Sequence, residues 1–579
     1  MATSYKTPGV YIQEENAFPN SAVAVETAVP VFIGYTEKAL RNGKSLLRKP
    51  TKINSFAEYV EIFGKGFKPK FTVGGGAPAS AAGATGTAPA TDAGAGAPAT
   101  TDTTAAPAGA PVAPAGEAGA GAAAAAAGSE ATAPAAGTPA ATGGAATPTV
   151  TPPVAGGGIS LDAIKINDKN TAYFYNSIRL FYANGGSSCY ILSVGTYEDQ
   201  TTLNVKSDDY LGTTTVFDLL VKEFEPTMIV MPDAIVLGEG AYNTVYTAAL
   251  KHCSDVQSRV CIFDLRKQLP TDVTDDLVEK FRTGIGSNFL NYGTAYYPWL
   301  KTAVVQADEL DYRNIDSSLD LATGLVAPNP KNDPLITKNN GNIQKIVSEF
   351  SKKTTPTPDE IKNFHQSLIA ASPIYTQILE EIRSQLNELP PSGAMAGIYT
   401  MVDNTRGVWK APANVSLSLV DAPSLNVSDR EQESLNVDVM GGKSINVIRP
   451  FPGIGTLVWG GRTLDGNSQD WRYINVRRTL IMIEQSLKLA TRAYVFEPND
   501  AGTWITIKSM ISNFLNNLWK QGALAGAAPE VAYDVQIGLG ATMTPNDILD
   551  GIMRITVKVA IVHPAEFIVI TFQQLQQQS

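Results

Sequence analysis

The chain has 579 residues, which is enough for several domains with a sizeable core, and it carries a formal net charge of −10. This acidic balance argues against nucleic acid as a partner, because a nucleic-acid face needs clustered lysine and arginine. Three cysteines without CxxC spacing and three scattered histidines indicate buried thiols in a reducing compartment. They predict no disulfide framework, no metal site and no cofactor.

The N-terminal residues carry no apolar core of a secretory signal, and no apolar run approaches the roughly 18–20 residues that span a bilayer. We therefore expect synthesis in the cytoplasm without a signal peptide, and no direct membrane insertion. Any export would have to use another route.

The first predicted element is a short strand in TPGVYIQEE, residues 7–15, inside an N-terminal arm that covers residues 1–20. The N-terminal part of the core follows over 21–73 and begins with a buried strand at 29–36. Ser55 and Glu58 then have the spacing of a capping box, which predicts a short helix that ends at Phe63.

A low-complexity insert covers residues 74–158 and consists mainly of Ala, Gly, Pro and Thr. It contains no lysine, arginine, aromatic residue, leucine or isoleucine. Such a segment cannot bury enough apolar surface to offset its chain entropy, so we expect it to be disordered. It is either a tolerated insertion or a spacer or coat on the outside of an assembly.

Strands and helices alternate after the insert, which predicts an α/β layer with a parallel sheet over residues 159–390. The predicted strands are 189–194, 228–231, 260–263 and 294–300. The predicted helices are 171–183, 216–224, 242–252 and 274–283. Residues 301–372 are polar and rich in proline and asparagine, and we expect a loop-rich excursion with patchy helices there.

An α+β part is predicted over 391–560, with one helix after Val476 and another over 501–521. In the second helix, apolar side chains recur at helical spacing from Ile507 to Leu518, opposite a polar stripe without any acid. The stripe is either a solvated face or a surface that docks an acidic partner. It consists of Lys508, Ser512, Asn516 and Lys520.

Two apolar strands are predicted to close the chain, over 554–562 and 566–572, and a C-terminal arm covers 561–579. An unpaired apolar strand at a terminus favours aggregation. It can pair within its own domain or extend a sheet edge of a neighbouring subunit. If both arms pair with neighbours, the contacts are heterologous and generate a helical filament or tube. The arm residues that would make these contacts are Val10, Tyr11, Ile12, Phe567, Ile568, Val569 and Ile570.

The most distinctive stretch is VWGGRTLDGNSQDWRYINVRRTL at 458–480, in which two of the six tryptophans lie among four arginines. Planar cations beside large aromatic rings favour stacking and bidentate contacts. The stretch is therefore either a protein interface or a strand–turn–helix corner whose arginines are satisfied inside one subunit. Its marked residues are Trp459, Arg462, Trp471, Arg472, Arg477 and Arg478.

Other motifs do not indicate catalysis. The sequence GGKS at 441–444 looks like the end of a phosphate-binding loop, but Val437 replaces the first glycine of that pattern. Asp233, Asp264 and Asp403 stand at strand or helix ends without a histidine or serine in a nucleophile setting, so we expect caps and turns. We predict that the protein is not an enzyme.

Seven stretches resemble the tail sheath proteins of contractile phage tails and related injection machines. They are TPGVYIQE near the start, FYANGGSSCYILSV at 181–194, GTAYYPWL at 293–300, PPSGAMAGIYTMVDNTRGVWKAPAN at 390–414, the stretch at 458–480, FEPND at 496–500 and PAEFIVITFQQ at 564–574. The resemblance adds Trp409, Glu497 and Pro498 to the signature residues. The insert and residues 301–372 look unlike the core of the family.

The resemblance implies a subtilisin-like α/β domain without a protease triad, and a C-terminal α+β domain that forms an inner layer facing a tube. Both arms would weave into neighbouring protomers, and six-membered rings would stack around the inner tube. The helix after FEPND would touch that tube through Lys508, Ser512 and Lys520. Contraction would repack the subunits and drive the tube through a target envelope.

The partners that the resemblance implies are other copies of this chain, an inner tube protein, baseplate proteins and terminal cap proteins, and it leaves room for a sheath paralogue. The particle would be a phage tail or a phage-tail-like device. Two other functions stay open at this point. One is a subtilisin-like α/β hydrolase, and the other is a non-contractile surface or adhesion filament protein with the insert as a stalk.

Overall fold

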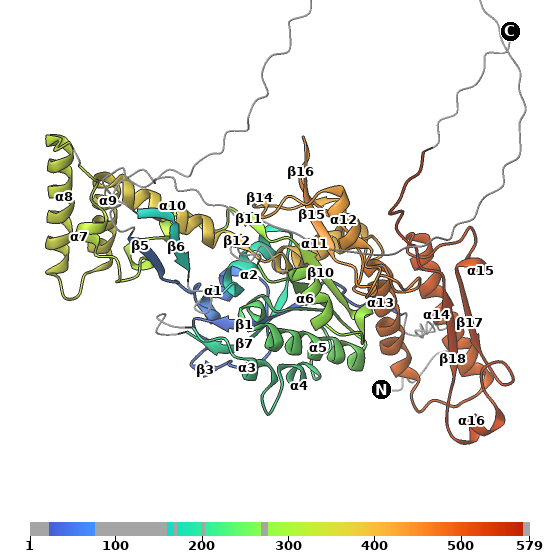
Figure 1. The fold of residues 1–579 in the computed structure, drawn as a ribbon. Helices are drawn as coiled ribbons and strands as arrows, with labels where there is room; N and C mark the ends of the chain where they lie inside the picture. Colours follow the sequence, from blue (N-terminus) through green and yellow to red (C-terminus); the bar gives the residue numbers. More distant parts are fainter. Residues whose placement is uncertain are drawn as a thin grey trace, which may run out of the picture. The chain divides into compact units, whose positions relative to one another are not determined.

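The computed structural model describes residues 22–75, 159–166, 171–197, 203–267, 276–329 and 331–570 (Figure 1). The N-terminal arm, all but the first two residues of the insert, and residues 571–579 lie outside this part of the chain. What the sequence predicts for those segments, including the contacts of Val10, Tyr11 and Ile12, therefore stays a prediction.

The largest sheet has nine strands in the order β13-β16-β15-β10-β9-β8-β1-β7-β4. Six neighbouring strands, from β15 to β7, run parallel, and the strands at both ends of the sheet are antiparallel. This arrangement confirms a mixed α/β protein with a large mixed sheet. The strands are β1 Pro30–Thr36, β4 Thr51–Ile53, β7 Cys189–Thr196, β8 Met228–Val230, β9 Val260–Asp264, β10 Gly293–Tyr297, β13 Val415–Ser416, β15 Asn446–Phe451 and β16 Gly455–Trp459.

Strand β1 shows why this layer is stable. All of its residues, PVFIGYT, are buried, as expected for a parallel strand that is covered on both faces. Helices α2 (Phe174–Ala183), α5 (Glu239–Val256) and α11 (Ser392–Arg406) pack on the strands, and α2 also packs against α11. A Cβ on Gly393 would lie 2.5 Å from the carbonyl oxygen of Ser177, so glycine allows α11 to approach α2 closely.

Four shorter helices complete this region. They are α1 Phe56–Phe63, α3 Ser207–Leu211, α4 Val216–Leu220 and α6 Leu277–Gly284. The side chain of Ser55 caps α1 as predicted, because its hydroxyl accepts from the amide of Glu58 at 3.2 Å. The Glu58 carboxylate, however, accepts from the amide of Asn54 and not from that of Ser55.

Residues 301–372 are mainly helical, and the prediction of a loop-rich excursion is wrong. Helices α7 (Leu321–Gly324), α8 (Pro334–Ser351), α9 (Pro358–Ala371) and α10 (Pro373–Leu386) share an apolar core with Phe71 and Ile164. Proline occupies the first turn of α8, α9 and α10, and an Asp, Thr or Ser side chain caps each of them. The prolines that indicated loops therefore mark helix starts.

The C-terminal part packs around a third apolar core, between α13 (Ile474–Thr491), α14 (Ala501–Lys520) and the antiparallel pair β17 (Tyr533–Ile537) and β18 (Ile555–Val559). Figure 1 shows α14 beside this strand pair, and contacts between α14 and β17 agree with the view. The strand predicted over 566–572 is wrong as far as Ile570, since residues 562–570 have no strand partner in the described chain.

The remaining elements are short. They are β2 Leu40–Arg41, β3 Lys44–Ser45, β5 Phe71–Gly75, β6 Ile159–Ile166, β11 Leu300–Thr302, β12 Glu388–Leu389, β14 Val420–Pro423, α12 Asp429–Asn436, α15 Pro529–Ala532 and α16 Pro545–Leu549. Strands β5 and β6 flank the insert and pair antiparallel, with Gly75 opposite Ile159. Among the described residues, no helix is long and apolar enough to cross a bilayer.

Candidate assembly interface

The carboxylate of Glu566 attaches the first residues of the C-terminal arm, which we call its root, to the protein body. Nη2 of Arg462 lies 2.6 Å from Oε2 of this carboxylate, and Nε of Arg462 donates to both oxygens. The hydroxyl of Tyr473 and the side-chain amide of Asn436 donate to it at 3.0 and 2.9 Å. Burial alone would raise the pKa of Glu566, but these hydrogen bonds outweigh it and hold the pKa below the ordinary value. We call this group the Glu566 clamp.

The loop from β16 to α13 places the basic side of the clamp. Arg462 and Tyr473 face each other in an antiparallel bridge, so both side chains leave the same corner. The amide of Arg462 donates to Oδ1 of Asn446 at 2.8 Å, and Nδ2 of Asn446 donates back to the carbonyl of Arg462. Nδ2 of Asn446 also reaches Thr294 Oγ1 and the carbonyl of Ala295 in β10. The clamp is thereby built on the central sheet.

The chain is bound to the protein body as far as Glu566 and is largely exposed directly after it. Ile561 forms a bridge with Leu524, and the side-chain amide of Asn475 donates to the carbonyl of Val562. The four apolar residues that follow Glu566 are exposed, with fractions of 71% for Phe567, 79% for Ile568, 88% for Val569 and 69% for Ile570. Four consecutive apolar side chains without cover are typical of a surface that binds another chain.

Two further arginines of the 458–480 stretch make their contacts within the chain, although the buried Nε of Arg477 has no hydrogen-bond partner among the described residues. The guanidinium of Arg477 lies 4.2 Å from the ring centre of Tyr292 and 4.8 Å from that of Trp471. The guanidinium of Arg478 forms a bidentate pair with Asp403, with both side chains at most 4% exposed. Arg478 also donates to the carbonyl of Thr27 and lies over the Tyr399 ring. These contacts agree with the corner alternative.

The other signature residues are spread around this corner. Nε of Arg472 donates to the carbonyl of Gly466, and Trp459, which is 39% exposed, packs against Phe451. Trp409 offers its carbonyl to Asn475. Glu497 and Pro498 lie elsewhere, exposed in the loop before α14.

Helix α14 separates an apolar face from a basic one. Its predicted apolar face from Ile507 to Leu518 is buried, while Lys508 and Lys520 are exposed and Ser512 is half-buried. Neither lysine forms an ion pair with any residue of the described chain. The two cations are therefore available to an acidic partner.

The buried aspartates have structural roles. Asp233 accepts from the amides of Tyr35, Tyr173 and Phe174, and burial raises its pKa to about 6. Asp264 accepts from the amide and hydroxyl of Ser392 at the start of α11, and burial raises its pKa to about 7. No histidine of the described chain contributes to either group through a hydrogen bond.

The GGKS loop is occupied by the chain itself. The carboxylate of Asp438 accepts from the amides of Met440, Gly441 and Lys443, which are the donors that a phosphate would need. Nζ of Lys443 donates to the carbonyl of Arg282. Across the described ranges, no group of three or more His, Cys, Asp or Glu side chains is arranged to hold a metal ion.

The C-terminal part of the chain is similar in sequence to a known protein family. Residues 467–574 match the family model described as the phage tail sheath C-terminal domain. The tail sheath protein of Vibrio phage KVP40 is 24% identical over 162 residues, which are 28% of this chain and 23% of the phage protein. That of Burkholderia phage BcepMu is 28% identical over 142 residues, which are 24% of this chain and 29% of the phage protein.

Residues 467–574 thus resemble the C-terminal domain of phage tail sheath proteins, and the chain shares local sequence similarity with curated tail sheath proteins. The matched regions span about a quarter of the length of these curated relatives. The fold extends the likeness to nearly the whole chain. The sheath of the extracellular contractile injection system PVC, in its contracted state, superposes with a TM-score of 0.52 at 24% identity and covers 99% of both chains.

The contracted helical sheath of the anti-feeding prophage has the same TM-score and identity, and covers 99% of this chain and 100% of its own. At this level of identity the likeness concerns the fold. The relatives and structures found are themselves tail sheath proteins or sheaths of contractile injection systems.

The sequence did not reveal Glu566 or Asn436 as part of the site. Glu566 is the one acid in the apolar run from Ile561 to Phe572, and this isolation was a usable signal. Its partner Arg462 lies 104 residues earlier, and only the fold brings the two together.

Proposed function

We propose that this protein is a structural sheath subunit of a contractile tail or injection machine. The observation that carries the proposal is the arm: Glu566 is clamped to the body, and the four apolar residues after it are largely uncovered by the described part of the chain. A fixed root followed by an uncovered apolar segment favours pairing with a sheet edge of a neighbouring subunit. The match of residues 467–574 to the phage tail sheath C-terminal domain supports the same function.

The acceptor of an arm in this proposal is the β17–β18 pair of a neighbouring copy. A sheet of two strands leaves one edge of each strand without a strand partner in the described chain. An N-terminal arm, through Val10, Tyr11 and Ile12, and a C-terminal arm, through Phe567 to Ile570, would extend these edges. Each contact joins different surfaces of two copies, and such heterologous contacts propagate into a helix.

The finer architecture follows the family. Copies of the chain form six-membered rings that stack around an inner tube protein, with baseplate and terminal cap proteins at the ends. The parallel part of the nine-stranded sheet is the subtilisin-like layer, used as a scaffold. Helix α14 faces the tube, and Lys508, Ser512 and Lys520 contact it. Whether a sheath paralogue takes part depends on the machine.

The mechanism is mechanical. The extended sheath is a high-energy packing that the baseplate and tube hold kinetically. After triggering, the subunits rotate and repack while the arms keep neighbours connected. A gain of a few kcal/mol per subunit, summed over many subunits, drives the tube through the target envelope.

Negative-stain microscopy of the purified chain, alone and with its tube protein, tests the proposal. Striated cylinders are expected for the unmodified chain. Deleting residues 1–15, or substituting Ile568→Asp and Ile570→Asp, should abolish them, because alternate residues of a strand share one face.

The matched control is Val439→Asp with Met440→Asp. These two apolar side chains are 88% and 96% exposed and lie outside both arms. The control should assemble normally. Monomers under all conditions, or unchanged cylinders from both arm variants, would contradict the proposal.

A further inference from the structure

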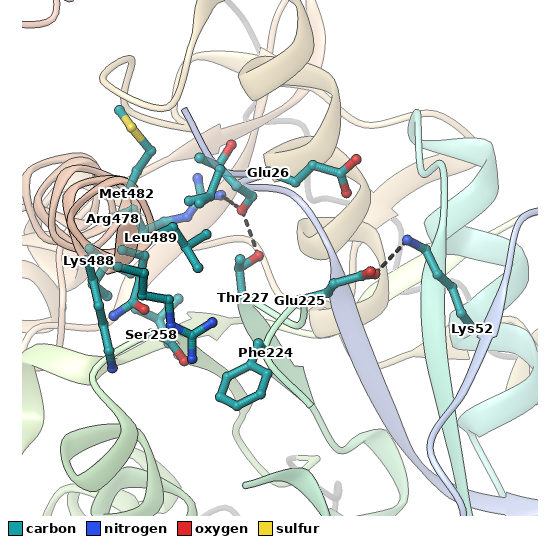
Figure 2. Close-up of a pocket in the computed structure, with 16 residues that line it drawn as sticks. Glu26, Lys52, Phe224, Glu225, Thr227, Ser258, Arg478, Met482, Lys488 and Leu489 are labelled. Atoms are coloured by element: carbon teal, nitrogen blue, oxygen red, sulfur yellow. Dashed lines mark hydrogen bonds and ion pairs between the residues drawn. The ribbon is translucent and has the colours of Figure 1, made fainter. Parts of the chain in front are cut away.

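A groove of about 400 Å³ lies between residues 25–27, the loop before β8 and helix α13 (Figure 2). This volume falls in the usual range of binding pockets, roughly 300–1,000 Å³. The lining is mainly apolar. Two of its apolar side chains, Phe224 and Leu489, remain 75% and 51% exposed, so the groove lacks a cover in the described chain.

The wall of the groove is held in place. The hydroxyl of Thr227 donates to the carbonyl of Thr27 at 2.7 Å, and Arg478 donates to the same carbonyl at 2.9 Å. The amide of Val25 donates to the hydroxyl of Ser486 in α13 at 3.0 Å. These bonds bind the first described residues to the sheet and to α13, so the groove exists before anything enters it.

The charges of the groove are separated. In Figure 2, Phe224 and Leu489 lie between Lys488 on one side and Glu26, Glu225 and Lys52 on the other. Lys52 is neutralised by Glu225 at 2.6 Å. Lys488 forms no ion pair with a described residue, and neither does Arg492, which follows it by one helical turn. One end of the groove is therefore basic and the other is acidic.

We infer that this groove binds the chain's own N-terminal arm, residues 6–15, before the subunit joins an assembly. The sequence of the arm matches the groove in order and in character. Its apolar residues 10–12 stand between Lys6 and the pair Glu14 and Glu15. Glu14 and Glu15 would pair with Lys488 and Arg492 at the basic end of the groove, and Lys6 would pair with Glu26 at the acidic end.

The tether makes this contact accessible. Ala22, the first described residue, packs in the C-terminal core beside α13, and Ile12 precedes it by ten residues. Ten residues span about 17 Å as a random coil and about 35 Å when fully extended. A short tether gives an effective concentration in the millimolar range, so weak docking is enough to occupy the groove.

The consequence concerns the timing of assembly and rests on the proposed function. A subunit whose arm is docked on itself has one arm fewer to offer a neighbour, so nucleation of the sheath is slowed. Once a neighbour offers a sheet edge, the arm exchanges from the groove to that edge. Monomers are thereby protected from premature association.

Cysteine cross-linking in the full chain tests the docking. Gln13→Cys is combined with Gln485→Cys, which lines the groove. The control combines Gln13→Cys with Leu335→Cys, which is 72% exposed on α8. The three native cysteines are buried, which limits their reaction with a mild oxidant. Both proteins are oxidised as dilute monomers and analysed by non-reducing gel and peptide mass spectrometry.

The expected result is an intramolecular disulfide that forms at least about tenfold faster in the groove pair, as the millimolar effective concentration requires. Equal rates in the two pairs would overturn the inference. Cross-links only between chains would also overturn it, while they would support arm exchange. Leu489→Asp should then shorten the lag before cylinders form. Absence of cylinders in every variant would contradict the proposed function and would leave the cross-linking result intact.

Discussion

Nη2 of Arg462 lies 2.6 Å from Oε2 of Glu566, the last residue before the exposed apolar residues of the C-terminal arm. Arg462 is 3% exposed, and its positive charge has no other carboxylate in contact among the described residues. The most conspicuous sequence stretch of this chain thus fixes the starting point of the C-terminal arm.

Glu566→Gln should destabilise the body and free the arm root, because it leaves Arg462 buried without a counter-charge. The expected loss is on the order of 2 kcal/mol. Thermal unfolding measures it, and limited proteolysis after residue 566 reports the root directly. Lys251→Gln removes an exposed partner of Asp255 and should cost less than about 0.5 kcal/mol. Equal losses of unfolding free energy for the two substitutions would show that the clamp stabilises the body no more than an exposed ion pair does.

Breaking the buried pair of Arg478 and Asp403 should lower the free energy of unfolding strongly. Replacing both residues with apolar ones should lower it only slightly. Asp403→Asn leaves a buried guanidinium without its partner, with an expected loss of about 3–5 kcal/mol. The double variant Arg478→Met with Asp403→Leu should recover most of this loss. Urea unfolding followed by tryptophan fluorescence gives the comparison. Arg430→Met, at an exposed position, serves as the control.

The pKa of Asp264 makes part of the stability depend on pH. Burial raises this pKa from 3.8 to about 7 in the folded chain. The contribution of the protonated side chain is therefore complete below pH 3.8 and is lost as the pH rises through about 7. The melting temperature should fall between pH 5 and pH 8 for the unmodified chain, and less for Asp264→Asn. Identical pH profiles of the two proteins would refute this assignment.

The insert should be removable without harm to the fold. Deleting residues 77–157 leaves Gly76 and Gly158 as a two-residue turn between Gly75 and Ile159, which already pair. The shorter loop should stabilise the body by on the order of 2–3 kcal/mol. Unfolding curves and negative-stain images of the shortened chain test this. Loss of soluble protein would mean that the insert is required for folding.

Reversing both free lysines of α14 should weaken attachment to the tube. Lys508→Glu with Lys520→Glu changes only exposed positions, so the melting temperature should stay within a few degrees. Co-sedimentation with the tube protein should drop at least tenfold, about 1.4 kcal/mol. Lys338→Glu with Lys345→Glu on α8 is the matched control. Unaltered co-sedimentation would remove α14 as the tube contact.

The sequence predicted elements whose pattern is local. Strand β1 was found because PVFIGYT is a continuous apolar run, and α14 was found because its apolar residues recur at helical spacing. Helices α8, α9 and α10 were missed because Pro334, Pro358 and Pro373 suggested loops. Their positions after Asp333, Thr357 and Ser372 were nevertheless helix-start signals.

The candidate site was predictable only in part. The apolar residues of the C-terminal arm were recognisable because they lie next to one another in the sequence. The clamp was not, because α12 supplies Asn436, the loop between β16 and α13 supplies Arg462 and Tyr473, and the C-terminal arm supplies Glu566. The aspartate that fills the GGKS loop was missed for a similar reason, since hydrogen bonding from backbone amides leaves no pattern in residue types.

The hydrogen bonds of Asn446 give the arm a short route into the protein body. Tension on the arm first reaches Glu566, passes to Arg462, and then enters β10 through the contacts of Asn446 with Thr294 and Ala295. In the proposed assembly, a pull from a neighbouring subunit would therefore reach the nine-stranded sheet through side-chain hydrogen bonds, and β18 through the backbone that leads to Glu566. The load on the arm would be divided between two sheets of the subunit.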